Sequence, residues 1–151
     1  MTVGPWKPIS LHTYDIRIVD VDIRCRVSET LGAEAIVNVE LSENTPGSIS
    51  VALGDVNGTV VRCYDGTTPE SGRTHTHFIC TPGEIDLWYP VHYGKQPLYT
   101  IEVQVKDAVG CVFDHVNLRM LMSMRLGQTH FGLKARKNCI PSHSCSRGGT
   151  S

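Results

Sequence analysis

Long hydrophobic runs and an excess of charge of one sign are both missing from this chain of 151 residues. No apolar stretch approaches the roughly 20 residues that a membrane-spanning helix needs. Residues 1–6 have neither the charged nor the apolar region of a secretory signal. The formal net charge of -1 leaves no basic footprint for nucleic acid. We therefore predict one globular domain with no membrane partner and no nucleic-acid partner.

A compact cysteine framework is missing as well. Small secreted domains without a sufficient core are stapled by cysteines at close, regular spacing. The cysteines here are instead spread along the chain, at Cys25, Cys63, Cys80, Cys111, Cys139 and Cys145. We therefore expect reduced, mostly buried thiols. An intracellular location is favoured, although the compartment stays open.

Spacing typical of a metal or cofactor site is also missing. His75 and His77 lie two residues apart in an alternating run, so they could hold zinc with a third ligand, but none follows at suitable spacing. The set of Cys139, His143 and Cys145 fits no structural zinc pattern. We predict that the two histidines face solvent, and we predict no metal and no cofactor.

The chain does contain about seven short runs in which apolar and polar residues alternate. Alternate side chains of a β-strand point to opposite faces, so each run predicts a strand with one buried face. The runs are residues 19–27, 33–41, 49–53, 59–64, 74–80, 99–105 and 116–126. In the last of these runs, Leu121 interrupts the polar face and leaves a helical alternative open.

Short connections between these runs indicate antiparallel neighbours. Asn57-Gly58 predicts a hairpin, since this dipeptide tolerates positive φ at both turn positions, and with Thr59 it also forms a glycosylation sequon. A polar loop is expected at residues 65–72. We predict an all-β fold: an antiparallel immunoglobulin-like two-sheet sandwich with a disordered C-terminal tail at residues 135–151.

A turn-rich stretch, residues 87–99, concentrates aromatic residues and prolines before one of the predicted strands. Pro90 and Pro97 fix φ and push the residue before each of them towards an extended conformation. Leu-Trp-Tyr-Pro followed by Tyr-Gly-Lys-Gln-Pro-Leu-Tyr resembles a segment of glycoside hydrolase family 2, above all of its β-mannosidases. There it leads into the penultimate strands of the immunoglobulin-like domain. His92 stands where those enzymes usually have glycine, so we expect the turn to differ here.

Two further segments extend the resemblance. Trp6-Lys7-Pro8, with Pro5 in place of the usual isoleucine, is similar to the segment that joins the family's sugar-binding jelly roll to its immunoglobulin-like domain. Residues 129–134 are similar to the Phe-Gly-Phe/Leu-Arg segment with which that domain ends. The implied domains are a terminal strand or linker from a missing jelly roll (1–14), the sandwich (15–134) and a tail that the family lacks (135–151).

The resemblance implies a parent enzyme that hydrolyses terminal β-linked mannose with retention of configuration. Such enzymes use two carboxylates about 5 Å apart, and the family carries both on a barrel, with the proton donor directly after an asparagine. No Asn-Glu dipeptide occurs in this sequence. The chain is therefore expected to be inactive alone, a fragment without catalytic residues whose partners are the neighbouring jelly-roll and barrel domains.

Aromatic side chains offer the remaining candidate site. They could form an interface with a neighbouring domain, since aromatic anchors often dominate interfaces, or a platform on which a sugar ring stacks. The interface is the preferred interpretation, and the alternative is a free-standing module that binds β-mannoside oligosaccharides or a protein. The candidate residues are Trp6, Trp88, Tyr89, Tyr93 and Tyr99.

Overall fold

The computed structural model of the chain describes residues 16–43 and 46–123. Several predictions from the sequence fall outside these residues: the terminal strand at 1–14 with Trp6, the end segment at 129–134 and the tail at 135–151. The end of the last predicted strand, residues 124–126, falls outside them too.

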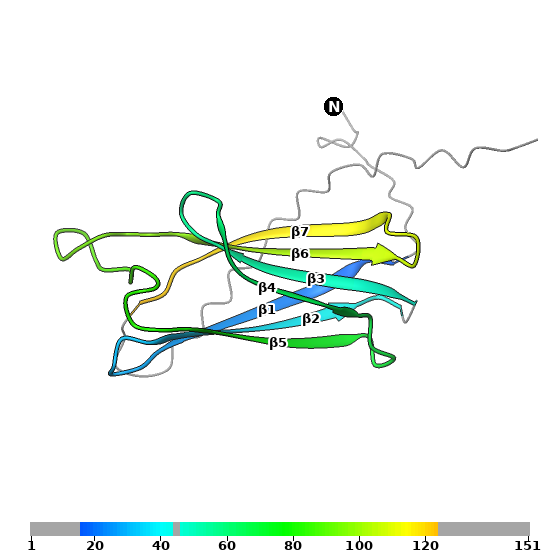
Figure 1. Cartoon of the computed structure of the whole chain (residues 1–151), viewed down its shortest axis with the longest axis horizontal. Coiled ribbons are helices and arrows are strands. Elements are labelled where there is room, and N and C mark those ends of the chain that lie inside the picture. The colour runs from blue at the N-terminus through cyan, green and yellow to red at the C-terminus, as the bar shows by residue number, and fades with distance from the viewer. Residues whose placement is uncertain (1–15, 44–45, 124–151) are drawn as a thin grey trace, which may run out of the picture.

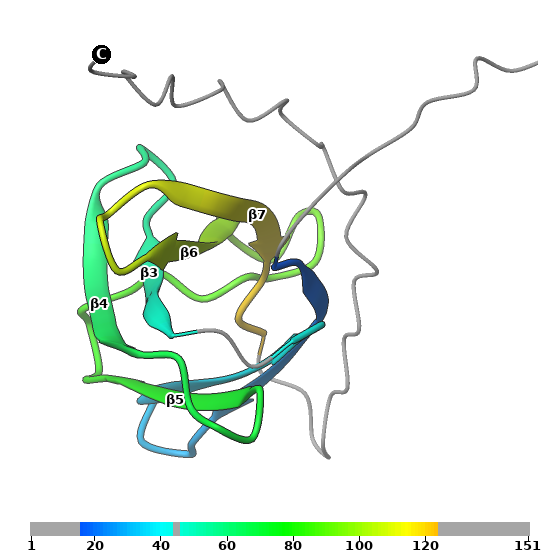
Figure 2. The same ribbon diagram turned by 90° about the vertical axis from the view of Figure 1, so that its right-hand side faces the viewer.

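The described residues form an all-β sandwich of two antiparallel sheets and contain no helix, as predicted (Figure 1). One sheet has the strand order β1-β2-β5 and the other has the order β4-β3-β6-β7. The two sheets face each other as separate layers in the turned view (Figure 2). The strands are β1 (Ile18–Val27), β2 (Ala33–Leu41), β3 (Gly47–Gly54), β4 (Val60–Thr67), β5 (Arg73–Cys80), β6 (Tyr99–Asp107) and β7 (Val112–Met120).

The core lies between the two sheets and is built by the inward-facing alternate residues. In β6, Ile101, Val103 and Val105 are fully buried while the residues between them are partly exposed. In β5, Phe78 and Cys80 are buried while His75 and His77 face outward. The alternation in the sequence therefore placed these side chains correctly, because it follows the pleat of each strand. No helix among the described residues is long and apolar enough to span a membrane.

Three local features differ from the sequence prediction. The pairing of β1 with β2 shifts register between Ile18 and Asp20, so Val19 is about half exposed and Ile18 is buried instead. A β-bulge of this kind adds one residue and interrupts the period of two. In the β3–β4 turn only Gly58 has positive φ (83°), so Asn57 does not share it. Strand β4 also continues to Thr67, into the stretch predicted as a loop.

The expectation of mostly buried thiols is wrong for the cysteines that the structure describes. Cys80 is buried, but Cys63 is exposed and Cys25 and Cys111 are half-buried. Cys25, Cys63 and Cys80 are free thiols. Burial raises the pKa of Cys25 to about 11, so this thiol stays protonated and unreactive at neutral pH.

Two threonines of β5 face the core, and their hydroxyl groups have no hydrogen-bond partner among the described residues. Thr74 is 7% exposed and Thr76 is 4% exposed. A buried hydroxyl without a partner loses its hydration and gains nothing in return. Replacing Thr76 with valine, which has the same shape, is expected to raise the free energy of unfolding by about 1 kcal/mol. Chemical denaturation measures this gain, and Thr67→Val at the exposed end of β4 should show none of it.

The aromatic corner as candidate functional site

Residues 85–99, here called the aromatic corner, connect β5 to β6 and are organised by Tyr99. The Tyr99 side chain is 3% exposed. Its hydroxyl donates to the backbone carbonyl of Asp86 at 2.9 Å and accepts from the backbone N–H of Asp86 at 2.8 Å. Immunoglobulin-like sandwiches often contain such a tyrosine, at the start of a strand and bonded to the backbone upstream. Tyr99 thereby fixes the base of the corner.

Further contacts hold the outer part of the corner in one conformation. The Tyr89 N–H donates to the Lys95 carbonyl at 2.9 Å, and the Tyr93 N–H donates to the Pro90 carbonyl at 3.0 Å. The Lys95 ammonium pairs with the Asp86 carboxylate at 3.0 Å. A Cβ atom on Gly94 would lie 2.9 Å from the Tyr89 ring, so this glycine lets the ring pack against the backbone. The turn at residues 90–93 is therefore presented on a braced loop.

His92 has positive φ (75°) at the tip of this loop. This is the residue for which the family resemblance gives glycine, and its backbone conformation is one that glycine adopts without strain. Among the described residues, Leu31 is the other non-glycine residue with positive φ. Strain of this kind persists where the surrounding structure enforces it, and it is concentrated at functional sites.

Replacing His92 with glycine is expected to raise the free energy of unfolding by about 1 kcal/mol, because the left-handed backbone costs a side-chain-bearing residue roughly that much. The matched control is His75→Gly in the extended backbone of β5, where glycine should destabilise the fold by about 0.5–1 kcal/mol. Urea denaturation compares the two variants. A loss of stability in His92→Gly would contradict the strain at this position.

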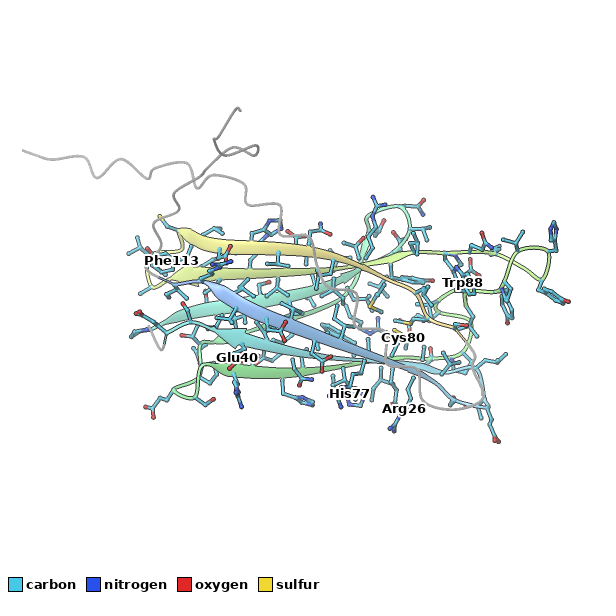
Figure 3. All side chains as sticks on the ribbon, turned by 180° about the vertical axis from the view of Figure 1, so that it is seen from behind. Arg26, Glu40, His77, Cys80, Trp88 and Phe113 are labelled. Carbon is cyan, nitrogen blue, oxygen red and sulfur yellow. The ribbon has the colours of Figure 1, made fainter. Side chains whose placement is uncertain are left out.

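The candidate aromatic residues divide into two groups. Tyr93 is 82% exposed and Tyr89 is 36% exposed. Trp88 is half-buried at the base of the corner (Figure 3). Tyr99 belongs to the core, so its ring offers no surface to a ligand. Trp6 lies outside the described residues. The structure thus brings Trp88, Tyr89 and Tyr93 to one end of the sandwich.

A second turn, formed by Thr81 to Glu84 between β5 and the corner, is linked to strand β4 of the other sheet. The Glu84 carboxylate accepts from the backbone N–H of Thr81 at 2.9 Å and from its hydroxyl at 3.1 Å. It also pairs with the guanidinium of Arg62 from edge strand β4. The Thr81 N–H bond and the neighbouring Arg62 lower the pKa of Glu84 below its ordinary value. This carboxylate therefore stays ionised and serves as an acceptor, whereas a general acid needs a raised pKa.

Replacing Glu84 with glutamine is expected to lower thermal stability at neutral pH and to lose this effect in acid. Because its folded-state pKa is depressed, the carboxylate stabilises the fold above its unfolded-state pKa, and the contribution disappears as pH falls through the folded-state pKa. The melting temperatures of the parent chain and Glu84→Gln should begin to approach each other near pH 4.5, the ordinary pKa of the carboxyl group, and should converge at lower pH, below the depressed folded-state pKa. A constant difference across the pH range would contradict this role, and Glu70→Gln in the exposed loop before β5 is the control.

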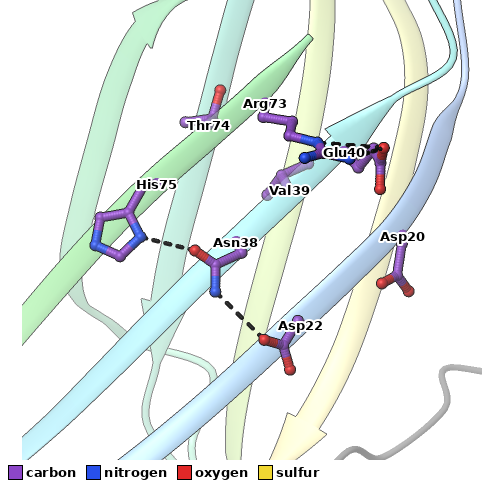
Figure 4. Close-up of a pocket in the computed structure, with 8 residues that line it drawn as sticks. All are labelled: Asp20, Asp22, Asn38, Val39, Glu40, Arg73, Thr74 and His75. Carbon is purple, nitrogen blue, oxygen red and sulfur yellow. Dashed lines mark hydrogen bonds and ion pairs between the residues drawn. The ribbon is translucent and has the colours of Figure 1, made fainter. Parts of the chain in front are cut away.

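The outer face of the sheet β1-β2-β5 carries a polar hollow of about 350 Å³ (Figure 4). His75 Nδ1 lies 2.7 Å from Asn38 Oδ1, and the Asn38 amide donates to Asp22 Oδ2 at 3.3 Å. In the next rung, Arg73 pairs with Glu40 at 2.9 Å. These groups satisfy one another across the strands, as cross-strand pairs do. The sequence did not reveal the hollow, because its walls come from three strands whose register no local pattern specifies.

The histidine pair of β5 takes separate partners on this face. His77 lies 3.6 Å from Glu34, while His75 is bonded to Asn38. Both rings face outward, as predicted. Within the described part of the chain no three side chains of the metal-binding types gather at one point.

Comparison with known proteins decides the family. The family model for glycosyl hydrolases family 2 matches residues 16–120, which is nearly the whole described sandwich. The chain belongs to this family. A curated relative, beta-mannosidase B of Thermothelomyces thermophilus, is 31% identical over 125 residues. The match takes in 79% of the present family 2 chain and 14% of that relative, so the chain spans a small part of its length.

Solved family 2 relatives share the sandwich. The β-glucuronidase of Bifidobacterium dentium, complexed with coumarin-3-O-glucuronide, superposes with a TM-score of 0.60 at 18% identity, over 72% of this chain and 18% of that one. The β-glucuronidase of Ruminococcus gnavus, complexed with D-glucuronic acid, gives 0.55 at 18% identity, over 72% and 16%. At this identity the likeness establishes the fold alone.

Proposed function

We propose that this chain is the accessory immunoglobulin-like domain of a family 2 β-mannosidase. The parent enzyme would hydrolyse terminal β-linked mannose with retention, and this domain would hold the neighbouring jelly-roll and barrel domains in position. The observation that carries the proposal is the 31% identity to a beta-mannosidase B along 125 residues. This domain-sized match is only 14% of the length of that relative. The chemistry then belongs to parts of the parent outside this chain.

The composition of the sandwich surface supports a role in positioning. Apolar side chains are exposed at the corner end, where Val91 is 62% and Leu98 is 44% exposed beside Tyr93. A contiguous group of exposed apolar residues can mark an interaction surface. Exposed apolar side chains also occur outside the corner, among them Val109 at 89% and Ile79 at 59%. The outer face of β1-β2-β5, in contrast, is covered by charged pairs such as Arg73 with Glu40. We assign the domain interface to the corner end and not to this charged face.

An assay with an aryl β-mannoside tests the absence of chemistry in this chain. The folded chain is expected to release no product above the rate of a buffer blank. Release that disappears in a carboxylate variant, such as Glu84→Gln or Glu102→Gln, would overturn the proposal. The reading frame on both sides of the coding sequence tests the partners: a jelly roll upstream and a barrel with an Asn-Glu pair downstream are expected.

The exposure of Tyr93 favours one second candidate, a module that binds a glycan by stacking. An 82% exposed ring on a braced loop is available to a sugar face. Titration of mannose-containing oligosaccharides against tryptophan fluorescence separates the two candidates. A saturable shift that Tyr93→Ala abolishes supports the module, and an unchanged spectrum supports the scaffold.

A further inference from the structure

The polar hollow on the outer face of β1-β2-β5 lies between two rungs of side chains (Figure 4). Each of the three strands contributes one residue to a rung, so the register of the sheet sets the positions of all six side chains. Neighbouring rungs on one face are two residues of strand apart, which is roughly 7 Å. The first rung is Asp20, Glu40 and Arg73, and the second is Asp22, Asn38 and His75.

The hollow exists because these side chains bond along the rungs and not between them. In the first rung, both bonds from the Arg73 guanidinium go to Oε1 of Glu40, at 2.9 and 3.3 Å. In the second rung, Asn38 joins His75 to Asp22. Among the residues that the structure describes, no hydrogen bond or ion pair connects one rung with the other. The space between the two rows therefore stays open.

The polar atoms around the hollow keep hydrogen-bonding capacity. The Asp20 carboxylate is exposed and has no hydrogen bond or ion pair within the described part of the chain. Asp22 accepts both of its bonds on Oδ2, which leaves Oδ1 unused. Glu40 uses Oε1 alone, so its Oε2 is unused as well. Carboxylate acceptors thus surround a space that also contains the donors of Arg73 and His75.

The charges around the hollow favour a neutral ligand. The Glu40 carboxylate is paired with Arg73 at 2.9 Å. The Asp22 carboxylate is paired with Arg24, also at 2.9 Å. Asp20 alone keeps an uncompensated charge, so the hollow attracts cations only weakly, while the three carboxylates repel an anion.

Hydroxyl groups match this set of atoms. A hydroxyl group both donates and accepts, so it can bond to a carboxylate and to a guanidinium or imidazole at the same time. We propose that the hollow binds one neutral sugar unit of a glycan through adjacent hydroxyl groups. Its volume of about 350 Å³ is at the lower end of the range for ligand pockets, which is roughly 300–1,000 Å³.

The hollow lies at the end of the sandwich away from the aromatic corner. Arg73 is the first residue of β5, whereas the corner follows the last residues of that strand. Figure 3 shows Glu40 and Trp88 towards opposite ends of the sandwich. A sugar in the hollow therefore leaves the proposed domain interface free. The site goes beyond the positioning role, so either of the two can fail without the other.

The test is an NMR titration of the full chain with methyl β-mannoside, in which the backbone amide signals are followed. Saturable shifts are expected at residues 38–40 and 73–75, with a dissociation constant on the order of 1–10 mM because a few polar contacts at a surface bind weakly. The anion glucuronic acid is expected to bind more weakly than the neutral sugar. No shift, or shifts confined to residues 85–99, would overturn the proposal. Tighter binding of the cation glucosamine would overturn the neutral ligand class.

The variant Asp20→Asn assigns the binding to the hollow. Its carboxylate has no partner within the described part of the chain, so the substitution keeps both the shape and the fold. The affinity for methyl β-mannoside is expected to fall about fivefold, because an amide oxygen accepts a hydrogen bond more weakly than a carboxylate does. Asp65→Asn makes the same change at an exposed position of β4, in the other sheet, and should bind like the parent. Equal affinities of the two variants would overturn the assignment.

Discussion

Replacing Tyr99 with phenylalanine is expected to lower the free energy of unfolding by about 2 kcal/mol, although one oxygen atom is all that is removed. The hydroxyl serves both the N–H and the carbonyl of Asp86, at 2.8 and 2.9 Å. Without it, two partly buried backbone groups lose their partner, and a polar group left unpaired costs more than a hydrogen bond contributes. Urea denaturation monitored by circular dichroism measures the loss.

The control for this variant is Tyr64→Phe on edge strand β4, where the side chain is 37% exposed. Its hydroxyl can be hydrated in either state, so the change should stay within about 0.5 kcal/mol. Hydrogen exchange adds a local measurement, because amides in the corner should lose protection in Tyr99→Phe before those of β3 do. Equal stability of the two variants would show that the corner does not depend on this hydroxyl.

Replacing Gly47 with alanine is expected to destabilise the sandwich by about 3 kcal/mol, the upper part of the range for overpacking. A Cβ atom at this position would lie 2.3 Å from the Lys106 carbonyl oxygen. Gly47 pairs with Asp107 at the end of the β3–β6 ladder, so the obstacle is backbone and cannot rotate away. The strands must separate locally, and the buried core beside them loses contacts.

Ser48→Ala is the matched control, one residue further along β3 on an exposed position. It introduces no atom near the neighbouring backbone and should leave the stability unchanged within about 0.5 kcal/mol. Thermal unfolding of the two variants measures the difference. A Gly47→Ala chain as stable as the parent would mean that β3 and β6 tolerate separation at this end.

The sequence predicted much of the fold because alternation reports directly on which face of a strand is buried. Strand β5 is a clear case, because Phe78 and Cys80 are buried while His75 and His77 are exposed. Strand β6 is another, with alternate residues buried from Ile101 to Val105. The period of two is a local property, so it carries over to the structure wherever the pleat is regular. The helical alternative for residues 116–126 is excluded as far as Met120, where β7 ends.

What the sequence could not predict depends on pairing between distant strands. The bulge at Val19 arises from the register of β1 against β2, which nothing near Val19 encodes. The polar hollow needs Asp22, Asn38 and His75 in one rung of three strands. Tyr99 was singled out as a surface candidate, yet its partner is Asp86 in the same corner. A tyrosine at the start of an inner strand, after a long turn, is the signal that points to a buried corner tyrosine.

The most direct test of the central claim is a domain exchange in the beta-mannosidase B of Thermothelomyces thermophilus. Residues 16–123 of this chain replace the matching segment, and hydrolysis of an aryl β-mannoside is measured. We expect a folded chimera that hydrolyses the substrate, while a chimera with an unrelated sandwich of similar size does not. If the chain folds alone but its chimera is as inactive as the unrelated one, it is not a positioning domain of this enzyme class.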